Sequence, residues 1–131
     1  MKKYVADWLP VIALCVVIFV QSSFPSPDFG PAFPLKDKVT HMAAYGLLAV
    51  LFYRACRVTW PERLSPAQLL VISVLFASLY GVSDEFHQSF VAARQADALD
   101  GVADVAGSIL GVLGYMGVVS RRGRNGLSKT G

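Results

Sequence analysis

Residues 67–88, AQLLVISVLFASLYGVSDEFHQ, combine the two features on which the predicted fold depends. Residues 67–83 carry no charged side chain, and they approach the roughly 20 apolar residues that a helix needs to cross about 30 Å of hydrocarbon. Asp84 and Glu85 follow immediately, so we expect the helix to continue past its apolar part into the membrane interface. The stretch therefore predicts a membrane-spanning helix with polar side chains at one end.

Three further apolar segments, residues 4–22, 39–56 and 98–119, have a similar length and composition. Inside a bilayer, only helices and closed barrels pair every backbone N–H and C=O. None of these segments shows the alternating polarity of a barrel strand. We therefore predict an all-α polytopic membrane protein, with four transmembrane helices in one compact bundle over residues 1–131. Residues 120–131 form a basic tail after the last span.

The composition argues against a soluble domain. Hydrophobic residues make up 54% of the 131-residue chain and charged residues 16%, whereas soluble domains average about 45–50% and about 25%. A soluble helical bundle needs charged outer faces on every helix, and this chain has too few charges to supply them. The first apolar segment resembles a secretory signal peptide, but no small-x-small cleavage site follows it. We therefore expect it to remain as a helix.

The distribution of basic residues predicts the orientation of the four spans. With an even number of spans, both termini and the second connector share one side of the membrane. The Lys and Arg residues of that side are Lys2, Lys3, Arg54, Arg57, Arg63, Arg121, Arg122, Arg124 and Lys129, and those of the other side are Lys36, Lys38 and Arg94. Because cytoplasmic segments carry the excess of basic residues, we predict that both termini are cytoplasmic. Nucleic-acid binding is not expected, since the basic tail is short and no aromatic residues interrupt it.

The polar residues that a bilayer tolerates poorly gather on the opposite side. They stand at the start of the second span, around the end of the third and at the start of the fourth: Asp37, Lys38, His41, Tyr45, Tyr80, Asp84, Glu85, His87, Gln88, Arg94, Asp97, Asp100 and Asp104. An unpaired ionisable group at membrane depth costs at least about 2.5–3.5 kcal/mol. We therefore expect these side chains to turn inward and meet in a polar pocket that opens to the exterior.

Residue spacing adds two expectations for the fourth span. Asp97, Asp100 and Asp104 stand at positions 0, +3 and +7, so they predict one stripe of carboxylates along a helix face. Gly107 and Gly111 form a small-xxx-small pair. Such a pair either permits the close approach of another helix or reflects the general frequency of Gly in membrane helices.

Several motifs stand in fixed order in and beside the apolar spans: Asp37-Lys38-x-x-His41-x-x-x-Tyr45, Tyr80-Gly81-x-x-Asp84-Glu85-x-His87-Gln88-x-Phe90, Arg94-x-x-Asp97-x-x-Asp100 and Gly107-x-x-x-Gly111. Together they resemble the VanZ-like family of small bacterial integral membrane proteins. The resemblance covers about residues 8–119, nearly the whole chain. It implies a bacterial inner-membrane protein of four spans.

The family's founding member is associated with reduced susceptibility to teicoplanin-type glycopeptides, so the resemblance implies a role at the cell envelope. The chain departs from the family in two places. Asp104 stands where the family usually has Asn, which adds a negative charge. Ala92-Ala93 stands where Pro-Gly often precedes the Arg, which loosens the turn that presents Arg94.

Our first functional hypothesis is a site that binds or acts on an anionic cell-envelope lipid or a lipid-linked cell-wall precursor. The catalytic candidates are His41, Glu85 and Asp100. Glu85, His41 or His87 would exchange protons, and Arg94 would hold the anion with Asp100 as its orienting partner. The substrate-binding candidates are Lys38, Tyr45, Tyr80, Gln88, Arg94 and Asp97.

Two alternatives stay open at this point. A divalent cation held by Glu85, Asp97, Asp100 and the His residues is one, because carboxylates with imidazole suit several metals. No HExxH or comparable signature supports it. The other is a structural network that ties the helices together, in a non-catalytic assembly or binding protein. The sequence predicts membrane lipids as partners and assigns neither an enzymatic activity nor an oligomeric state.

Overall fold

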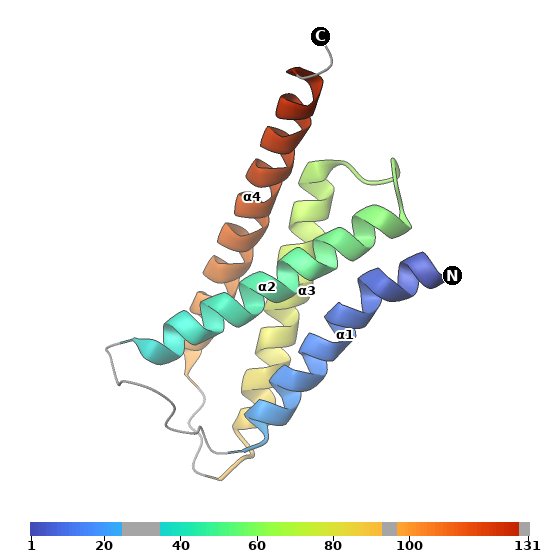
Figure 1. Ribbon diagram of the computed structural model, residues 1–131. Coiled ribbons are helices and arrows are strands. Elements are labelled where there is room, and N and C mark those ends of the chain that lie inside the picture. The colour runs from blue at the N-terminus through green and yellow to red at the C-terminus, as the bar shows by residue number, and fades with distance from the viewer. Residues whose placement is uncertain (25–34, 93–96, 129–131) are drawn as a thin grey trace.

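The structure is a computed structural model and describes residues 1–24, 35–92 and 97–128. All regular secondary structure in these ranges is helical (Figure 1). The helices are α1 (Lys2–Ser22), α2 (Lys36–Thr59), α3 (Pro66–Gln88) and α4 (Ala98–Ser128). All four are long and apolar enough to cross a membrane. The predicted all-α fold with four transmembrane helices is therefore confirmed, and the chain is a multi-pass membrane protein.

Local sequence explains where the helices begin and end. α2 ends at Thr59, two residues before Pro61, which cannot continue a helix. α3 begins with a capping box: the Ser65 hydroxyl accepts the N–H of Gln68, and the Gln68 side chain accepts the N–H of Ser65. Pro66 follows at the first helical position, where its missing N–H costs nothing. α4 begins after Asp97, whose Oδ1 accepts the N–H of Leu99 at 2.9 Å in the manner of an N-cap.

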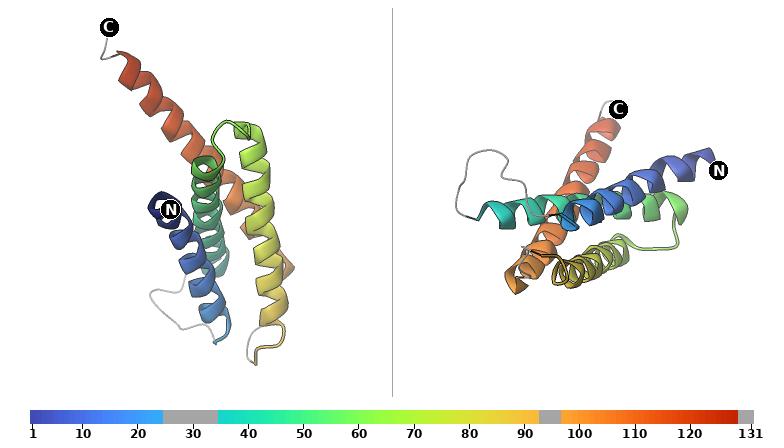
Figure 2. Two further views of the ribbon diagram at one scale, coloured as in Figure 1. Left: turned by 90° about the vertical axis from the view of Figure 1, so that its right-hand side faces the viewer. Right: turned by 90° about the horizontal axis from the view of Figure 1, so that it is seen from below.

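α2 occupies the centre of the bundle. It contacts each of the other three helices, and its interface with α4 is the most extensive. α1 contacts α2 and α3 but not α4 within the described residues. Figure 2 shows the C-terminal part of α4 extending beyond the other helices. Large apolar side chains such as Val16, Leu79 and Leu110 are more than half exposed, as expected where lipid surrounds the bundle.

Three glycines allow the backbones of α2 and α4 to touch. A Cβ atom added at Gly107 would lie 2.4 Å from the carbonyl oxygen of Met42 and 2.6 Å from its Cα. At Gly111 it would lie 2.8 Å from the carbonyl oxygen of Gly46, and at Gly46 it would lie 2.8 Å from the carbonyl oxygen of Gly107. Real Cβ atoms essentially never come this close to a backbone atom. The small-xxx-small pair of α4 therefore serves a close helix crossing.

The crossing and the connectors bring four helix ends together. The C-terminal ends of α1 and α3 and the N-terminal ends of α2 and α4 lie at one end of the bundle, in the lower part of Figure 1. The N-terminal end of α1 and the C-terminal part of α4 lie toward the opposite end. That the lower end faces the exterior stays a prediction from the distribution of Lys and Arg.

Candidate functional site

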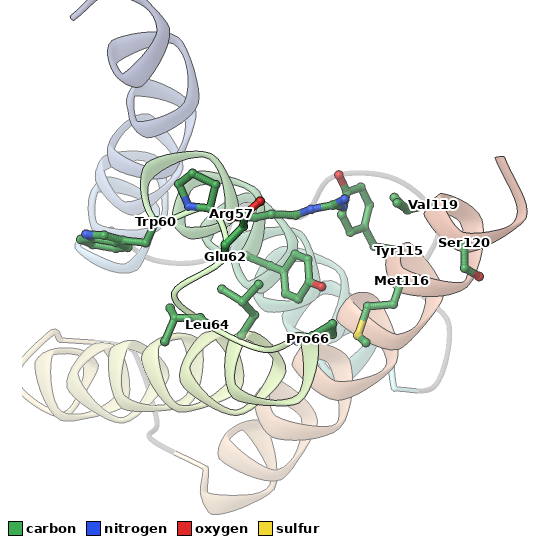
Figure 3. A pocket seen from close by; sticks show the side chains of 12 residues that line it. Arg57, Trp60, Glu62, Leu64, Pro66, Tyr115, Met116, Val119 and Ser120 are labelled. Carbon is green, nitrogen blue, oxygen red and sulfur yellow. The ribbon is translucent and has the colours of Figure 1, made fainter. Parts of the chain in front are cut away.

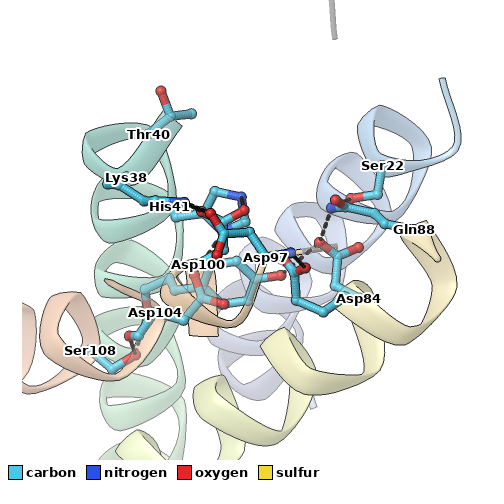
Figure 4. A network of polar contacts seen from close by, with 12 residues as sticks. Ser22, Lys38, Thr40, His41, Asp84, Gln88, Asp97, Asp100, Asp104 and Ser108 are labelled. Atoms are coloured by element: carbon cyan, nitrogen blue, oxygen red, sulfur yellow. Dashed lines mark hydrogen bonds and ion pairs between the residues drawn. The ribbon is translucent and has the colours of Figure 1, made fainter. Parts of the chain in front are cut away.

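Polar side chains from α2, α3 and the start of α4 converge at this end of the bundle. We call the following residues the polar cluster: Lys38, His41, Asp84, Glu85, Gln88, Asp97, Asp100 and Asp104. Figure 4 shows most of them pointing toward one another from three segments that are far apart in the sequence. Their interactions divide the cluster into a charged part, between α2 and α4, and a hydrogen-bonded part, between α1, α2 and α3.

His41 lies in the charged part between two carboxylates of α4. Its Nδ1 is 2.8 Å from Oδ1 of Asp104, and its Nε2 is 3.6 Å from Oδ2 of Asp100. The Asp104 side chain is only 1% exposed. A carboxylate on one ring nitrogen fixes the orientation of the ring, so the other nitrogen is presented in one direction. Here that direction is toward Asp100.

Gly81 on α3 makes room for the carboxylate that orients His41. A Cβ atom at Gly81 would lie 2.5 Å from Oδ2 of Asp104. This Oδ2 is buried and has no hydrogen-bond partner. The Gly of the Tyr80-Gly81 motif is therefore required by the volume of a side chain on a different helix.

Lys38 pairs with two carboxylates near the start of α4. Its Nζ is 2.6 Å from Oδ2 of Asp97 and also contacts Oδ1 of Asp100. The hydrogen bond from Lys38 lowers the pKa of the Asp97 carboxyl below its ordinary value, and the N–H of Leu99 contributes in the same direction. Asp97 was predicted to share a carboxylate stripe with Asp100 and Asp104. It precedes the first residue of α4 and caps the helix, and it binds the same Lys38 ammonium as Asp100 does.

Glu85 connects the end of α3 to the start of α4. Its Oε2 accepts the backbone N–H of Asp97 at 3.2 Å, whereas its Oε1 is buried and has no hydrogen-bond partner. Glu85, His41 and Asp100 each offer one ligand atom such that all three atoms lie within 4.8 Å of one another. The three catalytic candidates of the sequence analysis are thus neighbours, although they come from three different helices.

The hydrogen-bonded part of the polar cluster centres on Asp84. Its Oδ2 accepts the hydroxyl of Tyr45 at 3.1 Å and the amide of Gln88 at 3.0 Å. The Gln88 amide also donates to the hydroxyl of Ser22 on α1 at 3.2 Å. Tyr45, Asp84, Gln88 and Ser22 are all buried. This chain of bonds ties α1, α2 and α3 together, which is the arrangement expected of a structural network.

Tyr80 and His87 face α1. The structure records no contact between either side chain and the charged part of the polar cluster. The hydroxyl of Tyr80 donates to the carbonyl oxygen of Cys15 at 2.6 Å. The Nε2 of His87 lies 3.0 Å from the hydroxyl of Ser23, and its ring stacks on Phe19 with centroids 4.7 Å apart.

The predicted anion clamp, Arg94, lies outside the described residues, and so does its predicted pairing with Asp100. The partners of Asp100 in the described part of the chain are Lys38 and His41.

Two cavities lie away from the polar cluster. One, of about 450 Å³, lies between the α2–α3 connector and α4, and Figure 3 shows Arg57 and Trp60 beside it with Tyr115 and Met116 across from them. The other, of similar volume, has an apolar lining from α1, α2 and α3 that includes Tyr80. The predicted outward-opening polar pocket coincides with neither of them and stays a prediction.

Sequence reasoning undervalued Asp104 and missed Ser22. Asp104 was treated as the end of a stripe and as an added charge, yet it is the residue that orients His41. Its position four residues after Asp100 was the available signal, because both must then face α2 together. Ser22 at the end of an apolar span gives no signal in the sequence, since Ser is common there.

The sequence profile of the family described as VanZ/LLP1 matches residues 8–120 of the chain. An uncharacterized protein of Schizosaccharomyces pombe is 32% identical over 106 residues. That alignment covers 79% of this chain and 60% of the fungal protein, so the chain spans about 60% of the length of this relative. No solved structure matches the chain significantly.

Proposed function

The chain belongs to the VanZ/LLP1 family of membrane proteins, and from this premise we propose that its polar cluster binds the anionic headgroup of a membrane lipid or lipid-linked cell-envelope precursor. One observation carries the proposal. His41 is held by Asp104 with its other ring nitrogen toward Asp100 and near Glu85, at an end of a membrane bundle where lipid headgroups lie. A packed helix bundle does not need so many ionisable groups at one end, because each has to be desolvated.

The reaction class that these groups suit is hydrolysis or transfer at the headgroup. Oriented imidazole and carboxylate side chains are the groups that such reactions use. Because a similar protein occurs in a fungus, we favour phosphate, which lipids of bacterial and fungal membranes share. Reduced glycopeptide susceptibility would follow where the bound lipid carries a cell-wall precursor on the outer side of the membrane.

The alternative of a structural network is supported for one part of the polar cluster. Tyr45 and Gln88 both donate to Asp84, and Gln88 also donates to Ser22, so these bonds hold α1, α2 and α3 together. We therefore assign these residues to assembly, and the headgroup to the side of His41 and Lys38. Substitution of Tyr45 should then lower the amount of folded protein, whereas substitution of His41 should lower binding or turnover in protein that still folds.

Binding is tested with purified protein in neutral detergent and native mass spectrometry. The lipids are phosphatidic acid and a polyisoprenyl phosphate, with phosphatidylcholine as the zwitterionic control. We expect a preference for the anionic lipids that falls at least tenfold in Lys38→Met and persists in Arg57→Met, a basic residue near the opposite end of the same helix. Equal binding of anionic and zwitterionic lipids would overturn the proposal.

Turnover is tested by release of phosphate from the same lipids. His41→Gln should abolish it, and His87→Gln should retain it, because His87 lies at the same end of the bundle but faces α1. Equal losses in the two variants would show that His41 has no special position.

A further inference from the structure

We propose that His41, Glu85 and Asp100 bind one divalent first-row transition-metal ion, such as Mn²⁺ or Zn²⁺. The ligand atoms of these residues lie within 4.8 Å of one another. A tetrahedral ion bound at about 2.0–2.2 Å places its ligands about 3.3–3.6 Å apart, so the ligand atoms need to approach one another by up to about 1.5 Å, which rotation of the side chains can supply. One imidazole with two carboxylates is a donor set that suits these borderline ions, whereas Mg²⁺ is usually held by oxygen ligands and waters.

The hydrogen bonds around the three residues engage one atom of each and leave a second atom of each for an ion. Asp104 engages Nδ1 of His41, which leaves Nε2 for an ion. The N–H of Asp97 engages Oε2 of Glu85, and Lys38 engages Oδ1 of Asp100. Ligand side chains that are themselves hydrogen-bonded by a second group are the usual construction of metal sites, where a carboxylate behind the imidazole fixes its orientation.

A second observation is independent of this geometry. Oε1 of Glu85 is a buried carboxylate oxygen without a hydrogen-bond partner, beside the Asp100 carboxylate and the His41 ring. Behind the ring, Asp104 is 1% exposed and its Oδ2 also has no partner. Buried polar atoms normally find partners, so such orphaned oxygens call for a bound group.

The charge of the cluster favours a cation as well. Glu85, Asp100 and Asp104 stand together, and Lys38 already divides its charge between Asp97 and Asp100. Three carboxylates at the edge of a membrane repel one another and would repel an incoming phosphate. A divalent ion offsets the repulsion among the carboxylates. It also attracts the phosphate, because it can bind a phosphate oxygen directly.

The cation's role toward a phosphate rests on the proposed function, but its binding by the protein does not. The inference also narrows the earlier metal hypothesis. Asp97 is not one of the proposed ligands, because it caps α4 and pairs with Lys38. His87 is not one either, because it pairs with Ser23 and stacks on Phe19.

The test begins with Mn²⁺ alone and no added lipid. Purified full-length protein is stripped with EDTA and dialysed against Mn²⁺ or Zn²⁺, and bound metal is counted by mass spectrometry and, for Mn²⁺, by electron paramagnetic resonance. We expect one ion per chain and at least a tenfold loss of affinity in Glu85→Gln and His41→Gln. The matched control His87→Gln should keep the wild-type affinity. Wild-type protein that retains no ion would overturn the inference, as would equal affinity in Glu85→Gln.

Thermal unfolding keeps the test decisive if a variant folds poorly. An ion that binds only the folded state raises the unfolding temperature of wild-type protein in proportion to the logarithm of its concentration, and absence of this rise would contradict the site. The lipid assay is then repeated with Mn²⁺ and with EDTA. If the protein binds metal but does not prefer anionic lipids, the proposed function is refuted and the cation site is not. If the preference for anionic lipids is unaffected by EDTA, the cation does not bridge the protein and the headgroup.

Discussion

Substitution of Gly107 by Ala tests the close crossing of α2 and α4, on which the geometry of the polar cluster depends. The added methyl carbon would lie 2.4 Å from the carbonyl oxygen of Met42, whereas carbon and oxygen atoms in the closest favourable contacts are about 3.3–3.6 Å apart. The overlap is therefore about 1 Å. Both atoms at the contact are backbone or directly attached to it, so no flexible side chain can move aside and the helices must separate.

We expect Gly107→Ala to lower the free energy of unfolding by about 1–3 kcal/mol, the range typical of overpacked sites. Gly114→Ala is the matched control on the same helix, because a Cβ atom there meets nothing within 4 Å. It should be neutral or stabilising by up to about 1 kcal/mol, since Ala loses less backbone entropy than Gly. The measurement is reversible unfolding in mixed micelles, followed by circular dichroism during a titration with denaturing detergent.

The same substitution should disturb His41, which precedes Met42 in α2. Separation of the helices lengthens the 2.8 Å contact between His41 and Asp104, and the imidazole nitrogen resonances of labelled His41 should shift in Gly107→Ala but not in Gly114→Ala. If the two variants differ by less than about 0.5 kcal/mol and leave His41 alike, the helices do not touch at Gly107 and the reasoning fails.

Three further changes test individual contacts. Tyr45→Phe removes the hydroxyl that donates to buried Asp84 and should cost about 1–3 kcal/mol in the same unfolding assay; unchanged stability would mean that the bond is absent. Ser65→Ala removes the cap of α3 and should cost about 1 kcal/mol, whereas Ser65→Asp should retain stability; equal losses would contradict the capping role. Because Lys38 lowers the pKa of Asp97, ionised Asp97 stabilises the fold above its ordinary pKa, and this contribution disappears as the pH falls through the lowered value. Lys38→Met should raise the pKa of Asp97 in a carbon-13 titration of its carboxyl, and an identical titration curve would refute the ion pair.

The four spans and the shared location of the polar residues were predictable because hydrocarbon imposes strict requirements. Uncharged segments such as residues 67–83 have few alternatives to a membrane helix. An even number of spans then puts the polar ends of the second, third and fourth helices on one side of the membrane. These conclusions depend on composition and on counting, and they hold even when a helix end is misplaced by several residues.

The pairings within the cluster could not be predicted, since they depend on helix ends and rotations. A shift of one residue turns a side chain by about 100° around a helix, because a turn takes 3.6 residues. Asp97 was expected to share a face with Asp100, and both contact Lys38, but the sequence did not show that Asp97 precedes α4 and caps it. Tyr80 and Gly81 are adjacent in one motif, yet the first faces α1 and the second faces Asp104.

Asp104 stands where the resemblance noted in the sequence leads one to expect Asn, and its contacts indicate what a carboxylate adds to the site. The atom that meets His41 is Oδ1, and an Asn side chain has an oxygen at the equivalent position, so the hydrogen bond does not require the change. What Asp adds is a negative charge on a side chain that is 1% exposed, with Gly81 against its second oxygen. A charge in this place is tolerable only if positive charge stands on the other side of the contact. His41 supplies it either as imidazolium, paired with Asp100, or through a cation on Nε2 shared with Asp100 and Glu85. In both cases the carboxylate of Asp104 strengthens the binding of positive charge at His41. Three carboxylates around one imidazole are therefore the arrangement expected of a cation-binding site.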